Sequence, residues 1–404
     1  MNAEDPIATA LDHFVNDGHL AGVATLVWRD GKIIQTTCAG WQDLGSKLPM
    51  QPDALFRIAS MTKPITSTAA LMLVEEGRFA LEDPISRWAP EFAEMRVLRS
   101  PGAPLDESAA AERPITFEDL LTHRSGLTYG DFHCGPIGKA YEEALGGDID
   151  SEIDPDDWIA RLGTLPLIDQ PGGGFHYGHS TDLLGLLIGR IEDAPLGDVL
   201  ERRIFGPLGM KDTGFRVPAS KSGRKATAYG FDEAGRLAAR VAGPGRSFLP
   251  DRPENMAYVS GGQGLWSTLP DYLSFARMFL GGGVVDGVCL LRPETFSLMV
   301  SNRLTTSQRA KARWILNAGH GFGLGVAIVM DPVNAGPMPC GGGKGAVGWP
   351  GAFGGWWRAD PEDNSVLLFL SHNMVELEQM TQGIGLGVYA AIAKFQALAS
   401  AAGP

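Results

Sequence analysis

The sequence predicts an α/β fold of the α+β kind, in which an antiparallel sheet flanked by helices carries an inserted, mainly helical lobe. Three observations predict it. Strand-like runs stand near the N-terminus, helix-compatible segments fill the middle of the chain, and strand-like runs return after about residue 226. A chain that begins and ends in the same kind of structure is expected to close on itself as one lobe around an insertion.

The first elements are a helix, a hairpin and a second helix. Residues from Pro6 to Phe14 carry apolar side chains at helical spacing. The runs 21–28 and 32–40 are rich in β-branched residues, and Asp-Gly lies between them, which is a strong hairpin signal. Helical periodicity begins again near Ser60. This order predicts paired strands with helices packed on them.

The middle of the chain has little β-branched alternation, and turns containing proline and glycine separate its helical segments. We therefore expect a helical domain over residues 83–225 and a discontinuous α/β domain over 1–82 plus 226–404. The later strand candidates and the closing amphipathic helix are the segments 321–330, 345–360 (the strand expected to hold Trp349), 364–374 and 386–400.

Composition excludes several partner classes. The 404 residues carry a formal net charge of −13, and an acidic surface repels nucleic acid and anionic membrane surfaces. The N-terminus lacks the pattern of a signal peptide, and no stretch approaches the roughly 18 apolar residues of a membrane span. Four scattered cysteines, without C-x-x-C spacing, predict free buried thiols in a reducing compartment. We expect a cytoplasmic protein acting on a small molecule.

The strongest chemical signal is Ser60 followed by Lys63 at the start of a helix. Residues three apart share a helical face, so the hydroxyl and the ammonium can meet. A lysine of lowered pKa can activate the serine, and the helix N-terminus favours a developing anion. Taken alone, the same spacing also describes a helix-capping serine beside an exposed lysine.

Two further segments carry candidates. Tyr177 lies in a glycine-bounded loop before a helical run, where a phenol near a lysine can relay a proton. In residues 346–357, Gly351 and Ala352 allow a backbone N–H to approach a substrate carbonyl, and Trp349 can wall an apolar pocket. A packing tyrosine and a core strand are the alternative interpretations. Residues 260–262, Ser-Gly-Gly, are a weaker candidate for lining the cleft.

These motifs, in this order, resemble the class C β-lactamase and penicillin-binding-protein superfamily, and most closely the family VIII carboxylesterases. The resemblance runs from about residue 10 to residue 395. It rests on the phrases SMTKPIT, EEGRFALEDPISRWAPEF, ITFEDLLTHRSGL, GGGFHYGHSTDLLG, IFGPLGMKDTGF and GWPGAFGGWW. It implies the β-lactamase-like fold, a Ser60 nucleophile, Lys63 and Tyr177 as proton-transfer groups, and an oxyanion hole formed by the N–H groups of Ser60 and Ala352.

Two departures from the superfamily's pattern bear on the substrate. Trp349-Pro350-Gly351 stands where Lys-Thr-Gly is usual, which removes a cation and a hydroxyl suited to a carboxylate and adds apolar surface. His179 stands where asparagine often ends the second motif, so it is expected to line the pocket or to be a structural histidine. The first departure favours neutral acyl esters.

The sequence therefore predicts a serine carboxylesterase that hydrolyses short-chain esters through an acyl-enzyme, with slow β-lactam turnover as a side activity and no cofactor. His176 and His179 lack a further ligand nearby, so no metal site is expected. The alternatives are a β-lactamase, an acyltransferase or an amide hydrolase with the same nucleophile, and a non-catalytic small-molecule-binding protein.

Overall fold

A computed structural model describes residues 5–133, 135–147, 149–240, 252–253 and 256–401. Its central feature is an eight-stranded sheet in the order β12-β13-β14-β15-β16-β1-β2-β3, in which every neighbouring pair is antiparallel. The strands of this sheet are β1 Gly22–Arg29, β2 Lys32–Asp43, β3 Leu48–Pro49, β12 His320–Phe322, β13 Ala327–Val329, β14 Val347–Gly348, β15 Trp356–Asp360 and β16 Ser365–Ser371. The predicted antiparallel sheet is confirmed.

The helices of eight or more residues are α1 Pro6–Asn16, α2 Thr62–Glu75, α4 Pro136–Leu145, α5 Pro155–Gly163, α6 Ser180–Glu192, α9 Leu269–Ala276 and α14 Gly387–Ala401. The shorter ones are α3 Phe117–Leu121, α7 Leu196–Leu200, α8 Gly206–Leu208, α10 Pro293–Met299, α11 Thr306–Lys311, α12 Pro332–Ala335 and α13 Leu377–Thr381. Small strand pairs are β4 Phe56–Arg57 with β9 Trp266–Ser267, β5 Arg96–Leu98 with β6 Ser108–Ala110, β7 Tyr229–Phe231 with β8 Leu237–Ala239, and β10 Val284–Val285 with β11 Val288–Cys289.

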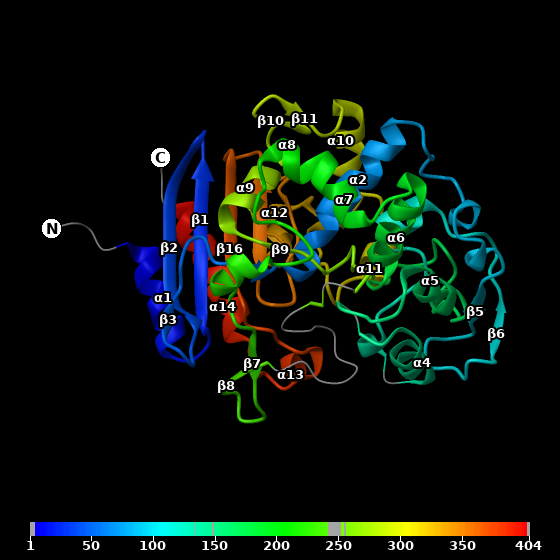
Figure 1. The fold of residues 1–404 in the computed structure, drawn as a ribbon, viewed down its shortest axis with the longest axis horizontal. Coiled ribbons are helices and arrows are strands. Elements are labelled where there is room, and N and C mark those ends of the chain that lie inside the picture. Colours follow the sequence, from blue (N-terminus) through cyan, green and yellow to red (C-terminus); the bar gives the residue numbers. More distant parts are fainter. Residues whose placement is uncertain (1–4, 134, 148, 241–251, 254–255, 402–404) are drawn as a thin grey trace.

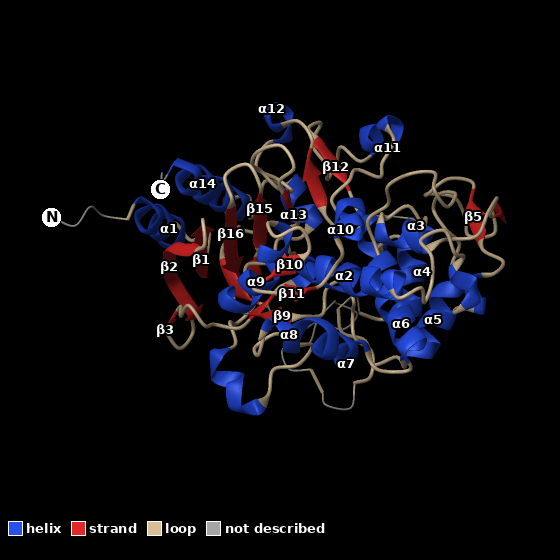
Figure 2. Ribbon diagram, turned by 90° about the horizontal axis from the view of Figure 1, so that it is seen from above, coloured by secondary structure: helices blue, strands red, loops and turns tan. Residues whose placement is uncertain are grey.

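Helices cover both faces of the sheet (Figures 1 and 2). On one face, α1 and α14 bury apolar side chains against Val23 of β1 and Phe369 of β16. On the other face, Leu26 and Leu368 join the larger core that α2 and α9 share. Because neighbouring side chains on a strand point to opposite faces, these continuous apolar strands require cover on both sides.

Helices α4, α5 and α6 of the helical part lie beyond α2, at the end of the molecule away from β2, whereas α8 lies near α9 (Figure 1). The helical part contains α3 to α8, and the β5–β6 pair is its only strand pair among the described residues. Buried residues of this part and of α2 form one continuous apolar cluster. The domain limits 1–82 plus 226–404 and 83–225 remain predictions.

Two local expectations were wrong. Trp349 follows β14 rather than lying within a strand, because the chain turns through 350–354 before β15 begins.

The second concerns the cysteines. The thiols are free at Cys38, Cys289 and Cys340, but Cys289 is exposed and Cys38 only half-buried; Cys134 lies outside the described residues. Over the part of the chain that is described, we find no helix long and apolar enough to cross a membrane.

His372, next to the end of β16, predicts an acid sensitivity of the fold. Its ring is buried, and burial lowers its pKa to about 4 although backbone carbonyls of Thr227 and Trp41 act in the opposite direction. The pKa of an unfolded histidine is about 6.5, so below that pH the imidazole is protonated in the unfolded state but stays neutral in the folded state. We expect this group to cost the fold about 3 kcal/mol of unfolding free energy by pH 4.

Urea unfolding of the wild type and of His372→Gln, from pH 7 to pH 4, measures this effect. The wild type should lose more stability than the variant over that range, and parallel losses in the two proteins would contradict the assignment.

Candidate active site

Ser60 lies in a short 3-10 turn, Ala59–Met61, that leads directly into α2. The preceding residue, Ala59, has a φ of +42°, a backbone conformation that costs energy in a residue with a Cβ. Such strain persists where the surrounding structure holds it, and here Ala59 is fully buried. The serine side chain is 6% exposed, so it is nearly enclosed at the start of the helix.

Lys63 is buried one turn further along, and three acceptors surround its ammonium group. Its Nζ donates to Ser60 Oγ at 3.2 Å, to the Tyr129 hydroxyl at 3.2 Å and to the Gly262 carbonyl at 3.1 Å. An ammonium has three N–H donors, so each has a partner. The predicted meeting of the hydroxyl and the ammonium is present in the structure, and so is the predicted proximity of residues 260–262.

Two tyrosines flank Lys63 in different ways. Tyr129, from the loop after α3, presents its hydroxyl to the ammonium. Tyr177 presents its ring, whose centroid lies 4.5 Å from Nζ, while its hydroxyl accepts a hydrogen bond from Trp349 Nε1 at 2.9 Å. The structure thus brings Tyr177 to the site, but Tyr129 is the phenol in hydrogen-bond contact with the lysine nitrogen.

A buried carboxylate, Asp182 of α6, lies behind this group. It accepts hydrogen bonds from His179 Nδ1 at 3.1 Å, from the Gly262 N–H at 3.0 Å, from the Tyr129 hydroxyl at 3.4 Å and from the Ser260 hydroxyl. Burial alone would raise the pKa of Asp182, but the hydrogen bond and charge of His179, with the charge of Lys63, hold that pKa below its usual value. Asp182 is therefore the anion that balances the buried lysine.

Gly351 brings the turn after β14 against the backbone that precedes Ser60. A Cβ at this position would lie 2.4 Å from the Ile58 carbonyl oxygen, so no residue with a side chain fits without a shift. Ala352 packs against the cluster formed by Ala59, Ile149 and Phe353. The chain segments of the two expected oxyanion donors, Ser60 and Ala352, are thus side by side.

Trp349 and His123 enclose the tyrosines from the other side. Trp349 is 1% exposed, and its ring centroid lies 5.3 Å from that of Tyr177. His123, whose φ is +54°, packs its ring 4.7 Å from Tyr177. Burial, followed by the charge of Lys63, lowers the pKa of His123 well below its ordinary value, so this histidine is neutral beside Lys63.

A family model described as Beta-lactamase matches residues 7–388 of the sequence. The chain belongs to the beta-lactamase family. It is 31% identical over 378 residues to Esterase EstB of Burkholderia gladioli, with 90% of this chain and 89% of that protein covered. It is 46% identical over 365 residues to Protein Rv1367c of Mycobacterium tuberculosis, covering 89% and 88%. With EstCE1, "a hydrolase with promiscuous acyltransferase activity", it shares a TM-score of 0.76 and 25% identity, covering 96% and 97%.

These similarities make the chain a serine hydrolase of the beta-lactamase family, related to esterases, as the sequence predicted. The eight-stranded antiparallel sheet with its helical part is the fold of this family. The nucleophile and the other individual site residues remain assignments from sequence and geometry, and their chemical roles are proposed below.

In this beta-lactamase-family hydrolase, two polar residues of the site were missed from sequence. Tyr129 belongs to the loop LTHRSGLTYG, for which the sequence predicted no catalytic residue. Asp182 lies three residues after His179, on the same helical face, and that spacing could have paired them. His179 itself packs between the Tyr129 and Tyr141 rings and binds Asp182, so its side chain is built into the wall of the site.

The two histidines considered as metal ligands have separate partners. His176 Nε2 contacts Asp169 Oδ2 at 2.9 Å, whereas His179 Nδ1 contacts Asp182. Within the described ranges, no group of three or more His, Cys, Asp or Glu residues is placed to hold a metal ion.

Proposed function

We propose that this serine hydrolase is a carboxylesterase that hydrolyses neutral short-chain esters through an acyl-enzyme on Ser60. The observation that carries the proposal is the hydrogen bond between the buried Lys63 ammonium and Ser60 Oγ. A serine needs a neighbouring base to become nucleophilic, and among the described residues Lys63 is the titratable side chain that hydrogen-bonds that oxygen.

In the first step, Ser60 Oγ attacks the ester carbonyl and gives up its proton to a base. The base is either Lys63 in its neutral form, after it has passed a proton to a neighbouring phenolate, or that phenolate itself. The backbone N–H groups of Ser60 and Ala352 bind the oxyanion, a contribution often worth about 3 kcal/mol per donor. Collapse of the intermediate breaks the ester C–O bond, and the alcohol leaves with a proton from the lysine–tyrosine group. Water then repeats the attack on the acyl-enzyme with the same groups.

The surroundings of Ser60 support a neutral, short acyl group. On the side of Ala59, the cluster of Ile149 and Phe353 with Ala228, Ala352 and Met374 offers apolar contacts. On the other side, Trp349 stands where the superfamily usually has a lysine, and its indole N–H donates to the Tyr177 hydroxyl. These described residues of the two sides supply no cation for a substrate carboxylate, which disfavours penicillins and peptide C-termini.

A substrate panel tests the function. We expect p-nitrophenyl acetate and butyrate to be hydrolysed at least about ten-fold faster, in kcat/KM, than the octanoate, because the large side chains of Ile149 and Phe353 cluster with Ala59 next to the nucleophile. Nitrocefin should be turned over more slowly still. Strong nitrocefin turnover with poor ester cleavage would make the protein a β-lactamase instead.

Acyl transfer is the second candidate, because EstCE1 combines both activities in its description. An acyl-enzyme partitions between water and any alcohol that reaches it, so adding methanol or 1-butanol to the butyrate reaction measures the transfer fraction. If more butyric acid than butyrate ester of the added alcohol forms at millimolar alcohol, hydrolysis remains the assigned activity.

The two tyrosines are distinguishable by conservative substitution. We expect Tyr129→Phe, which removes the hydroxyl bound to Lys63, to lower kcat by roughly 10²-fold and to shift the pH–rate profile. Tyr177→Phe removes a hydroxyl that here contacts Trp349, and its effect on kcat measures whether that hydroxyl turns toward the leaving group during turnover. A larger loss in Tyr177→Phe than in Tyr129→Phe would assign proton transfer to Tyr177, as the family resemblance implies.

A further inference from the structure

A row of aromatic rings runs from the lysine to the protein surface. Phe132 contacts both tyrosines, with centroid distances of 5.7 Å to Tyr129 and 6.3 Å to Tyr177, and its ring is stacked on the latter at 24°. Trp314 packs edge-on against Phe132 at 5.3 Å. We call Phe132 and Trp314 the aromatic rim.

Trp314 is unusual because it is 52% exposed. Of the nine tryptophans, all of which lie in the described ranges, it is the only one classed as exposed. Its half-open indole is connected to Lys63 through Phe132 and Tyr177, so apolar surface in contact with water is continuous with the aromatic wall of the site. Exposed apolar surface continuous with a site is a mark of ligand contact.

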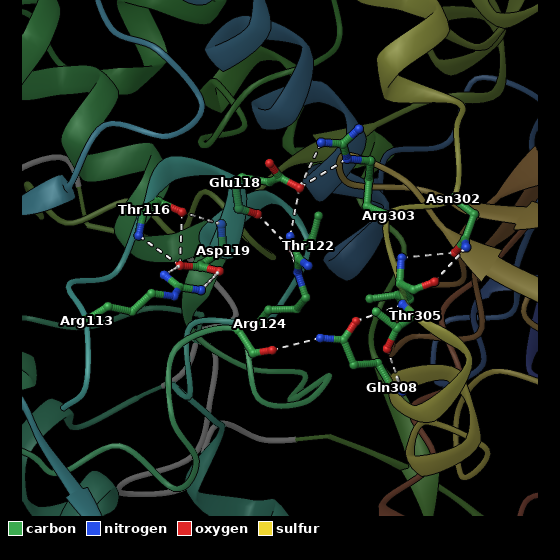
Figure 3. A network of polar contacts seen from close by, with 12 residues as sticks. Arg113, Thr116, Glu118, Asp119, Thr122, Arg124, Asn302, Arg303, Thr305 and Gln308 are labelled. Atoms are coloured by element: carbon green, nitrogen blue, oxygen red, sulfur yellow. Dashed lines mark hydrogen bonds and ion pairs between the residues drawn. The ribbon is translucent and has the colours of Figure 1, made fainter.

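Polar contacts join α3 and its following loop to the segment around α11. Arg303, just before α11, donates to Glu118 Oε1 through Nε at 3.1 Å, and Arg124 donates to the same oxygen at 2.7 Å (Figure 3). Gln308 of α11 donates to the Gly172 carbonyl at 2.8 Å. These bonds attach the helical part of the chain to the segment that leads to Trp314, and the Trp314 ring itself packs on Phe132.

The rim lies on the side where the alcohol must leave. The departing alkoxide takes its proton from the lysine–tyrosine group, so the alcohol part of the ester must sit beside Tyr129 and Tyr177. Phe132 contacts both of these rings. We expect the acyl part to lie on the other side of Ser60, toward the separate cluster around Ala59 and Phe353.

We propose that the aromatic rim binds the alcohol part of the substrate and that the preferred substrates are short-chain esters of aryl or fused-ring alcohols. Flat rings gain both buried area and ring–ring contacts against Phe132 and Trp314, which small aliphatic alcohols do not. This inference rests on the proposed esterase function and adds to it the class of alcohol.

The test compares 2-naphthyl acetate with ethyl acetate and with ethyl 2-naphthoate in Trp314→Ala and Phe132→Ala. Trp314→Ala should raise KM for 2-naphthyl acetate by roughly three- to ten-fold, with kcat within about two-fold of wild type, because its ring lies one ring further from Lys63 than Phe132. Phe132→Ala should raise the same KM and also lower kcat for both acetates, because it removes packing from Tyr129 and Tyr177. In Trp314→Ala, ethyl acetate kinetics should be nearly unchanged, and Trp314→Phe should recover most of the affinity for the naphthyl ester.

Ile33→Ala is the matched surface control. Ile33 is 55% exposed on β2, at the end of the molecule opposite α11 in both views (Figures 1 and 2), and its loss should affect no substrate. Equal losses for ethyl acetate and 2-naphthyl acetate in Trp314→Ala would overturn the inference, and a loss confined to ethyl 2-naphthoate would overturn the placement of the alcohol. Failure of the wild type to hydrolyse any of the three esters would instead overturn the proposed esterase function.

Discussion

Ser60→Ala should lower ester turnover by about 10⁴-fold or more while leaving the fold intact, because no acyl-enzyme can form without the hydroxyl. The side chain is small, and its hydroxyl accepts a hydrogen bond from the Lys63 ammonium, so its removal leaves no large cavity. The loss should appear in kcat, with KM little changed, since substrate binding relies on other groups.

Ser67→Ala is the matched control for this experiment. Ser67 lies on the same helix α2, is 1% exposed, and its hydroxyl has no hydrogen-bond partner among the described residues. It should retain wild-type kcat/KM within about two-fold. Mass spectrometry after mixing with a slowly hydrolysed ester should find the acyl mass on the wild type and on Ser67→Ala but not on Ser60→Ala.

The same experiment decides between an enzyme and a binding protein. Full esterase activity in Ser60→Ala would remove the nucleophile assignment and the mechanism with it. Stoichiometric binding of esters by the wild type, with no turnover, would support the non-catalytic alternative.

Lys63→Met should cost roughly 10³-fold or more in kcat, the second large effect. Methionine approximates the length of the lysine chain but offers no donor to the Ser60, Tyr129 and Gly262 oxygens, so it removes the base and the charge together. It also leaves the buried Asp182 without one of its cations, and an unbalanced buried charge destabilises a fold by about 3 kcal/mol. The Lys63→Met variant should therefore be assayed at a temperature well below the midpoint of its own thermal unfolding.

Lys63→Arg separates the two roles of the lysine. Arginine keeps the positive charge but cannot give up its proton in a protein, so it should be as inactive as the methionine variant if Lys63 moves protons. Activity within ten-fold of wild type in the arginine variant would assign the lysine a purely electrostatic role. Circular dichroism and unfolding curves of all three proteins separate loss of chemistry from loss of structure.

Much of the fold could be predicted because its signals are local. The Asp30-Gly31 hairpin, the first helix and the strand 365–371 follow from turn chemistry and periodicity over ten or so neighbouring residues. Trp349 was misplaced by the same reasoning, since an apolar, glycine-rich run is equally compatible with a strand and with a tight turn. The structure adds that a Cβ at Gly351 would clash with the Ile58 carbonyl, which explains why this turn needs a glycine.

The sequence by itself determined that Ser60 and Lys63 meet, because a spacing of three on a helix brings two side chains together whatever surrounds them. Tertiary structure decided the rest of the site. Tyr129 reaches Lys63 across 66 residues, Gly262 across 199, and Trp349 reaches Tyr177 across 172. Contacts of that separation depend on how the helical part packs against the sheet, and no local pattern in the chain encodes which of two tyrosine hydroxyls that packing directs at the lysine.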